Sequence, residues 1–215
     1  MGLPEKHVPV IKKDKCMHPL VFATNNPHKV AEVQAAVGNS VGIITLRDAG
    51  IMIDIPEPHL TLEANASEKS WTIHRLTGND CFSEDTGLEV TALHGAPGVH
   101  SAYYGGPERS AQKNIARLLT ALKDKPDRSA RFRTIISLIW NEKEFFFEGI
   151  CEGRIALEET GGQGFGYDPV FVPDSHEISF AQMSREEKNA CSHRKKAVDK
   201  MVAFLNMRAA NNVHQ

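Results

Sequence analysis

Two adjacent carboxylates, Glu84 and Asp85, lie in the segment FSEDTGLEV at 82–90 and could bind a metal ion or activate a water molecule. Mg²⁺ usually takes one or two protein carboxylates and fills its other positions with water and substrate phosphate oxygens. A carboxylate here could instead orient or deprotonate an attacking water. Neighbours in a regular strand point to opposite faces, so both groups would reach one cation only if the strand breaks. Thr86 and Gly87 predict such a break, and the alternative is a plain surface turn.

The segment TNNPHK, at 24–29, combines small polar residues with a lysine. We expect a strand to end there and a helix to begin at Pro27, which places Lys29 in the first turn. The free amides of a helix start bind phosphate, and a lysine adds a formal charge. The GxxxxGK[ST] phosphate-binding loop is absent from the sequence. An ordinary capped helix with a surface lysine is the alternative.

A ligand with an aromatic base would suit the segment that ends in FGYDP. Four glycines at 161–166 would let the backbone pass close to a ligand, and Phe165 and Tyr167 offer faces on which a purine could stack. Asp168 precedes Pro169, which favours an extended backbone and a fixed carboxylate. The alternative is an aromatic hairpin packed into the core.

Basic residues gather in REEKNACSHRKKA, at 185–197. The Arg194 guanidinium could donate to the 6-keto oxygen and N7 of a purine. In adenine the amino group at that position is itself a donor and would face the donors of the guanidinium. If the segment is one helix, Lys188 and His193 are not ideal neighbours, and a bend near Ser192 would help to bring them together. A solvated basic face is the alternative.

The elements that would position these groups mix helices with strand pairs, so the sequence predicts an α/β fold with a mixed sheet. Period-two alternation predicts strands, helical apolar stripes predict helices, and Thr61, Gly78 and a Ser184–Glu187 capping box mark helix ends. The expected elements are a strand at 19–24, helices at 27–37, 62–76 and 111–122, a strand at 130–140 paired across 141–143 with 144–150, and a closing helix around 197–205.

Composition limits the class of protein. The 215 residues are 41% hydrophobic and 24% charged, which fits one large domain or two intimate lobes at 19–215, after a loose extension at 1–18. A formal charge of −2 gives no net positive field for nucleic acid or an anionic membrane, and we find no run of apolar residues long enough to span a bilayer. The four cysteines are far apart, which favours reduced thiols in a cytosolic protein.

Taken in order, TNNPHK, SEDTGLEV with GAPGVHSA, FGYDP and EEKNACSHR resemble the signatures of the inosine triphosphate pyrophosphatase family, over about residues 19–206. That family cleaves non-standard purine nucleoside triphosphates. The resemblance implies an elongated mixed β-sheet flanked by helices, with two lobes and a central nucleotide cleft. It also implies a cytoplasmic homodimer and Mg²⁺-dependent hydrolysis of ITP, dITP or XTP to the monophosphate and pyrophosphate.

Site residues follow from the resemblance by matching position. Asp85 corresponds to the catalytic proton acceptor and metal ligand, with Glu84 and Glu57 as candidate further ligands. The implied substrate-binding residues are Thr24, Asn25, Asn26, Lys29, Lys69, Thr86, Phe165, Gly166, Tyr167, Asp168, Lys188, His193 and Arg194.

Two positions depart from the family pattern: Asn25 stands where glycine is frequent, and Tyr103 replaces the arginine usual in SAR. The second departure leaves one expected basic contact without a counterpart. A pyrophosphatase for pyrimidine triphosphates and a catalytically silent nucleotide sensor remain as alternatives, although the intact acidic pair argues against silence.

Overall fold

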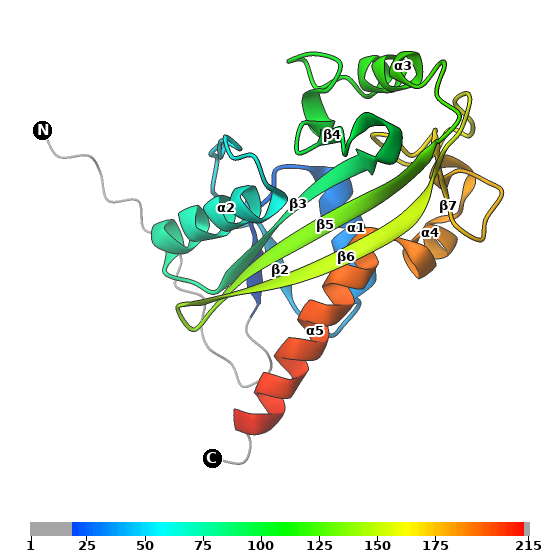
Figure 1. Cartoon of the computed structure of the whole chain (residues 1–215). Helices are drawn as coiled ribbons and strands as arrows, with labels where there is room; N and C mark the ends of the chain where they lie inside the picture. Colours follow the sequence, from blue (N-terminus) through cyan, green and yellow to red (C-terminus); the bar gives the residue numbers. More distant parts are fainter. Residues whose placement is uncertain (1–18, 213–215) are drawn as a thin grey trace, which may run out of the picture.

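A seven-stranded mixed sheet forms the centre of the molecule, and the computed structural model describes residues 19–212 of the chain (Figure 1). The strand order is β2-β1-β3-β5-β6-β7, with β4 on the free side of β3. β1 runs parallel to β2 and β3, and the other pairs are antiparallel. The expected mixed sheet is therefore confirmed. The strands are β1 (Leu20–Phe22), β2 (Ile43–Thr45), β3 (Cys81–Val90), β4 (Pro97–Gly98), β5 (Ser129–Trp140), β6 (Lys143–Ile155) and β7 (Phe171–Pro173).

Helices cover both faces of this sheet, with α2 on one face and α1 and α5 on the other (Figure 1). The helices are α1 (Pro27–Val37), α2 (Leu62–Thr77), α3 (Ala111–Ala121), α4 (Arg185–Cys191) and α5 (His193–Asn212), with 3-10 turns at Thr91–Leu93, Ser101–Tyr103 and Phe180–Gln182. The predicted capping residues act as expected: Thr61 accepts from the Ala64 amide, and Gly78 ends α2 in the left-handed region. The helical segment is interrupted at Ser192, because α4 ends before this residue and α5 begins after it.

Apolar packing differs between the two ends of the sheet. Beneath α1 and α5, Phe22 and Phe82 stack with ring centroids 4.4 Å apart. At the end that carries α3, a second cluster surrounds Phe132 and Phe171. Burial of this apolar area holds the long hairpin of β5 and β6 in place. No helix within residues 19–212 is long and apolar enough to cross a membrane.

The expected break at 84–87 is wrong, because β3 runs unbroken from Cys81 to Val90 and pairs with β5 along its whole length. Tertiary pairing with β5 overrides the local turn signal. Gly87 instead allows close approach of β4, since a Cβ atom there would lie 2.7 Å from the Gly98 carbonyl oxygen. Glu84 and Asp85 consequently point to opposite faces of the sheet.

The other edge of β3 is open in its middle. β1 pairs with β3 only at Cys81 and Phe82, and β4 only at Leu88 and Glu89. Among the described residues no strand covers positions 83–87 on that side. Ligands of α/β proteins bind outside the carboxyl ends of parallel strands, and here the chain leaves β1 directly into the predicted phosphate loop. The division into two lobes stays a prediction, and the extension expected at 1–18 lies outside the described residues.

Candidate active site

On the α2 face of β3, Asp85 shares the Lys69 ammonium with Glu57. Lys69 Nζ lies 2.5 Å from Glu57 Oε1 and 3.3 Å from Asp85 Oδ1. Asn65 Nδ2 donates to Asp85 Oδ2 at 3.3 Å, and Asn65 Oδ1 accepts from the amide of His59 at 3.0 Å. Helix α2 thus supplies the lysine and the amide, and the 51–60 segment supplies Glu57.

Burial affects the two acids of this cluster differently. It raises the pKa of Asp85, and the Lys69 and Lys29 ammonium groups oppose that rise only in part. Burial also acts to raise the pKa of Glu57, but the contact with Lys69 outweighs it and leaves that pKa below its usual value. A carboxylate with a raised pKa is a better proton acceptor, which is the property that general base catalysis requires.

Carboxylate chemistry in this cluster fits a magnesium ion. Glu57 and Asp85 converge on one ammonium group, so a cation already lies between two hard oxygen donors. Within residues 19–212 no three His, Cys, Asp or Glu side chains gather in a way that could hold a metal ion. Two protein ligands suffice for Mg²⁺ when water and substrate phosphate complete its shell.

Glu84 is committed to other partners on the opposite face. Lys29 Nζ lies 2.8 Å from Glu84 Oε1, and Arg194 Nε lies 3.3 Å from Oε2. Thr86 Oγ1 donates to the same oxygen at 2.8 Å. Burial acts to raise the pKa of Glu84, but Arg194 and Lys29 hold it well below its usual range. Its geometry fits an anion that fixes two cations, and it fits the expected role of metal ligand less well than Glu57 does.

A second acid on this face, Glu32, orders the basic residues late in the chain. Lys188 Nζ lies 2.7 Å from Glu32 Oε1 and 2.6 Å from Asp168 Oδ2. Arg194 also pairs with Glu32. Sequence reasoning did not identify this residue, although it lies three positions after Lys29, on the same face of α1. Lys188 and Arg194, from different helices, are therefore held together by one carboxylate.

Phe165 reaches this basic cluster, but Tyr167 does not. The Phe165 ring stacks on His28 with centroids 5.0 Å apart, and Lys188 Nζ lies 5.1 Å from its centroid. Asp168 Oδ2 accepts from the Phe165 amide at 2.7 Å, which fixes the turn around Gly166. The prediction that a purine stacks on Tyr167 is wrong, because the Tyr167 ring is buried in the apolar core and its hydroxyl donates to a backbone carbonyl at 2.9 Å.

His193 lies at the start of α5 and is fully buried. Its ring stacks on Phe132 with centroids 4.6 Å apart. Its Nδ1 atom has no hydrogen-bond partner in the part of the chain that the structure describes. Burial, with the positive charges of Arg194 and Lys188 nearby, lowers the pKa of His193 well below its usual value. The imidazole is therefore neutral, and its buried Nδ1 atom is left without a hydrogen bond to any described residue.

The predicted phosphate loop holds its own shape with its polar side chains. Asn26 Oδ1 accepts from the amides of His28 and Lys29, and Thr24 Oγ1 accepts from the Asn26 amide at 3.2 Å. Asn25 Nδ2 donates to the Ile53 carbonyl at 2.8 Å, which ties this loop to the segment that carries Glu57. Lys29 joins the two charged clusters, since its ammonium pairs with Glu84 and also acts to lower the pKa of the acids on the α2 face.

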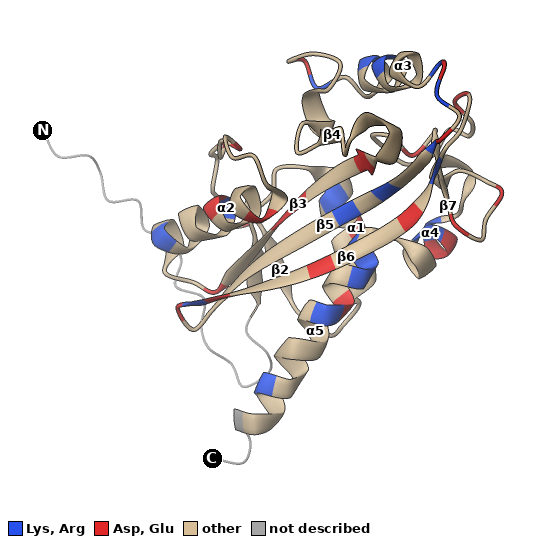
Figure 2. Ribbon diagram, in the orientation of Figure 1, with Lys and Arg blue, Asp and Glu red and all other residues tan. Residues whose placement is uncertain are grey.

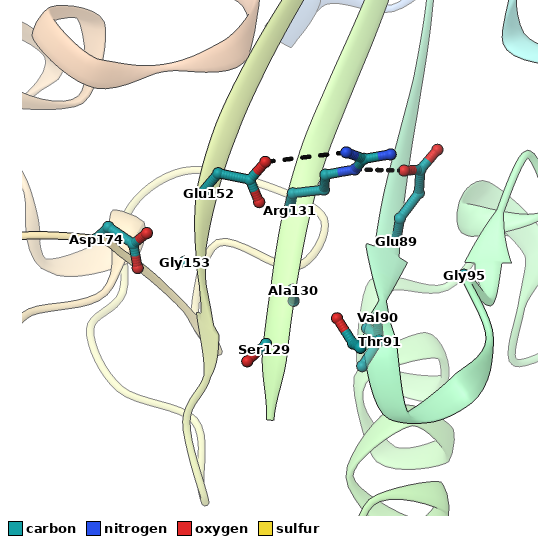
Figure 3. Close-up of a pocket in the computed structure, with 10 residues that line it drawn as sticks. All are labelled: Glu89, Val90, Thr91, Gly95, Ser129, Ala130, Arg131, Glu152, Gly153 and Asp174. Atoms are coloured by element: carbon teal, nitrogen blue, oxygen red, sulfur yellow. Dashed lines mark hydrogen bonds and ion pairs between the residues drawn. The ribbon is translucent and has the colours of Figure 1, made fainter. Parts of the chain in front are cut away.

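The charged surface farther along the sheet is separate from these clusters. Arginines of β5 lie between acidic residues of β3 and β6 (Figure 2). An open depression of about 390 Å³ lies there, where Arg131 Nε donates to Glu89 Oε2 at 2.7 Å (Figure 3). None of the predicted site residues lines it. Tyr103, which replaces the arginine of the family pattern, contacts His100.

Comparison with known proteins places these residues in context. The sequence profile of the Ham1 family matches residues 20–204. A protein of Porphyromonas gingivalis named dITP/XTP pyrophosphatase is 50% identical over 190 residues, covering 88% of this chain and 98% of its own. One of the same name from Flavobacterium psychrophilum is 46% identical over 186 residues, covering 86% and 98%. The solved structure of the Staphylococcus aureus Ham1 protein superposes with a TM-score of 0.81 at 34% identity, covering 89% of this chain and 100% of that one.

Proposed function

Since the chain belongs to the Ham1 family, we propose that it hydrolyses non-standard purine nucleoside triphosphates (ITP, dITP and XTP) to the monophosphate and pyrophosphate. The names of its relatives, and sequence identity of up to 50% among those compared, support this assignment. One observation carries the proposal at the level of the site. The Asp85 and Arg194 clusters flank the same open edge of β3, and Lys29 acts on both.

The acidic cluster suits the triphosphate. Lys29 and Lys69 would bind the phosphate oxygens and stabilise the negative charge that develops on the departing pyrophosphate. Asp85, with its raised pKa, would accept a proton from the water that attacks the α-phosphorus. Glu57 and Asp85 would hold a magnesium ion, which when bound supplies charge neutralisation at the phosphates.

The basic cluster suits a keto purine. Arg194 can donate to the 6-keto oxygen and N7, and the free His193 Nδ1 provides a further polar contact. Phe165 provides a ring face beside these groups. A site built on such donors rejects adenine, because its buried polar groups would then stay unpaired.

Pyrophosphate release in the presence of Mg²⁺, measured with ITP, dITP, XTP, ATP and UTP, tests the proposal. We expect turnover of the three keto purines and at least about a hundredfold lower kcat/KM for ATP. Preference for UTP would favour a pyrimidine triphosphate pyrophosphatase. Binding of ITP without release would favour a silent sensor. Equal rates on ITP and ATP would contradict the assigned base contacts.

A homodimer and a cytoplasmic location complete the proposal. Met52 and Leu60, on the segment that carries Glu57, are 86% and 81% exposed, and such apolar side chains suit association with a second copy. Light scattering across a range of concentrations tests the dimer, which a constant monomer mass would contradict.

The cytoplasmic location rests on the substrate class, and fractionation of cells producing the protein tests it.

A further inference from the structure

Two thiols face each other where the base-binding segment meets the sheet. Cys151 is buried on β6, and Cys191, the last residue of α4, is half-buried against the same apolar cluster. Each thiol acts on the pKa of the other, lowering that of Cys191 and raising that of Cys151. The chain runs from Cys191 through Ser192 directly into His193 and Arg194, so this contact lies two residues from the predicted purine contacts.

Backbone packing independent of the thiols keeps this junction close to β6. A Cβ atom at Gly149 would lie 2.0 Å from the His193 carbonyl oxygen, so the start of α5 rests on the strand. Gly149 and Cys151 share one face of β6, because side chains alternate along a strand. Lys196 Nζ donates to the Ile150 carbonyl at 2.8 Å. The backbone approach at Gly149 and the hydrogen bond at Ile150 therefore hold the part of β6 that carries Cys151 against the α4–α5 junction.

Cys151 is also coupled to the histidine of the site. It pairs across the sheet with Phe132, the residue on whose ring His193 stacks. Cys191 Sγ contacts the carbonyl oxygens of Glu187 and Lys188 at 3.6 Å, inside the helix that presents the Lys188 ammonium. A covalent bond between the two sulfurs would change the contacts of α4 and, at the same time, those of the Phe132 ring on which His193 stacks.

We propose that Cys191 and Cys151 form a peroxide-sensitive dithiol whose oxidation to a disulfide restrains the α4–α5 junction and lowers activity at the adjacent site. Cytosolic disulfides are usually transient and regulatory, which fits a half-exposed thiol beside a buried partner.

The reaction balances with a peroxide as the oxidant. The Cys191 thiolate attacks a peroxide oxygen, the S–O bond forms, the O–O bond breaks, and the departing hydroxide takes up the thiol proton as water. The Cys151 sulfur then attacks the sulfenic sulfur of Cys191, the S–S bond forms, and the S–O bond breaks to release a second water with the Cys151 proton. The two thiols lose two electrons, which reduce one peroxide to two water molecules.

The surroundings assign the two roles. The neighbouring Cys151 thiol, followed by the charges of His176 and Lys196, lowers the pKa of Cys191 although burial opposes this. The Cys191 thiol, burial and Asp174 raise the pKa of Cys151, which Lys196 opposes. Cys191 is therefore the attacking thiolate and Cys151 the resolving thiol.

The first experiment follows the chemistry alone. The folded protein is treated with hydrogen peroxide, blocked with N-ethylmaleimide and digested with trypsin without reduction. We expect a disulfide that joins peptides 144–154 and 189–194, formed before the buried Cys81 is modified. Iodoacetamide at pH 7 should also alkylate Cys191 more slowly in Cys151→Ala than in the wild type, because the thiol that lowers the pKa of Cys191 is lost. Oxidation of Cys191 no faster than Cys81, or absence of the crosslink, would overturn the proposal.

The second experiment measures ITP hydrolysis and rests on the proposed function. We expect oxidation to lower kcat/KM by about tenfold, since small displacements of ligand-contacting groups carry such losses, and dithiothreitol to restore it. Cys191→Ser should keep the basal rate and lose the response to peroxide, as should Cys151→Ala. Cys16→Ser is the control that keeps the response. Unchanged hydrolysis by the crosslinked protein would overturn the regulatory effect. A protein that hydrolyses no ITP in either state would refute the proposed function. In that case the mapped crosslink would still test the thiol chemistry.

Discussion

Glu84 and Asp85 are neighbours in the chain, yet their carboxylates lie on opposite faces of β3 and hold different cations. Glu84 pairs with Lys29 and Arg194, and Asp85 pairs with Lys69. Strand geometry imposes this alternation, and both residues lie in the stretch of β3 whose outer edge is covered by no strand among the described residues. One acid therefore orders the basic cluster, and the other remains beside the predicted phosphates.

Asp85→Asn should bind ITP and lose turnover. The amide keeps the shape of the side chain but cannot accept a proton, so we expect kcat to fall by about 10²–10⁴-fold. Pyrophosphate release gives kcat, and calorimetric titration gives the affinity for ITP. Glu89→Gln is the matched control, since it changes an acid on the same face of β3 outside the site and should leave kcat unaltered. Full turnover in Asp85→Asn would remove Asp85 from the role of base.

Glu84→Gln should act first on stability. The substitution removes one of the two carboxylates that pair with the fully buried Arg194 guanidinium, and also the partner of Lys29. Breaking a buried pair in this way costs about 3–5 kcal/mol. We expect the free energy of unfolding in urea to fall by that amount, and Asp85→Asn to be much less destabilised. Equal stability of Glu84→Gln and the wild type would show that the carboxylate does not anchor Arg194.

Local signals in the sequence predicted a large part of this arrangement. Thr61, Gly78 and the capping box at Ser184 placed helix ends correctly, because these residues satisfy backbone groups within three or four positions. Lys29 pairs with Glu84 and Lys69 pairs with Asp85, so residues of separate motifs lie close together, and their binding to a single ligand stays a prediction.

Contacts between distant parts of the chain could not be predicted in the same way. Glu32 contacts Lys188 and Arg194 across 156 and 162 positions, so no local pattern identifies it. Continuous pairing with β5 overrode the turn signal of Thr86 and Gly87. Tyr167 could not be told from Phe165 by type or spacing, because only the packing around each ring decides which one is buried.

Glu57→Gln should change the metal requirement more than Glu84→Gln does. Glu57 is the second carboxylate that converges with Asp85 on Lys69, so its loss should raise the Mg²⁺ concentration needed for half-maximal hydrolysis by about tenfold or more. The comparison uses kcat measured against Mg²⁺ at saturating ITP for both variants. A larger shift in Glu84→Gln would assign the ligand role to Glu84.

His193→Phe should reduce the loss of stability in acid. The folded protein keeps His193 neutral, whereas the unfolded chain takes up a proton near pH 6.5, so the unfolded state binds more protons below that pH. The free energy of unfolding therefore falls by up to about 1.4 kcal/mol per pH unit, from pH 6.5 down to the lowered pKa of the folded state. Phenylalanine keeps the stack on Phe132 and removes this dependence.

Urea unfolding between pH 5 and 7.5 measures the effect, as a shallower slope of the free energy of unfolding against pH in His193→Phe. His94→Asn, at an exposed left-handed position that asparagine tolerates, is the control and should keep the wild-type slope. Parallel slopes for all three proteins would mean that His193 titrates alike in the folded and unfolded states.

Gly149→Ala should separate α5 from the sheet. The added methyl group would lie 2.0 Å from the His193 carbonyl oxygen and 2.5 Å from the Ala197 amide nitrogen, so the helix start must shift. Overpacking of this kind costs about 1–3 kcal/mol, and we expect that loss in urea unfolding together with a raised KM for ITP, because the same turn carries Arg194. Gly162→Ala, where a methyl group meets open space, is the control and should be close to neutral. If the two variants are equally stable, then α5 does not rest on β6 at this glycine, and the close junction on which the placement of Arg194 depends would be refuted.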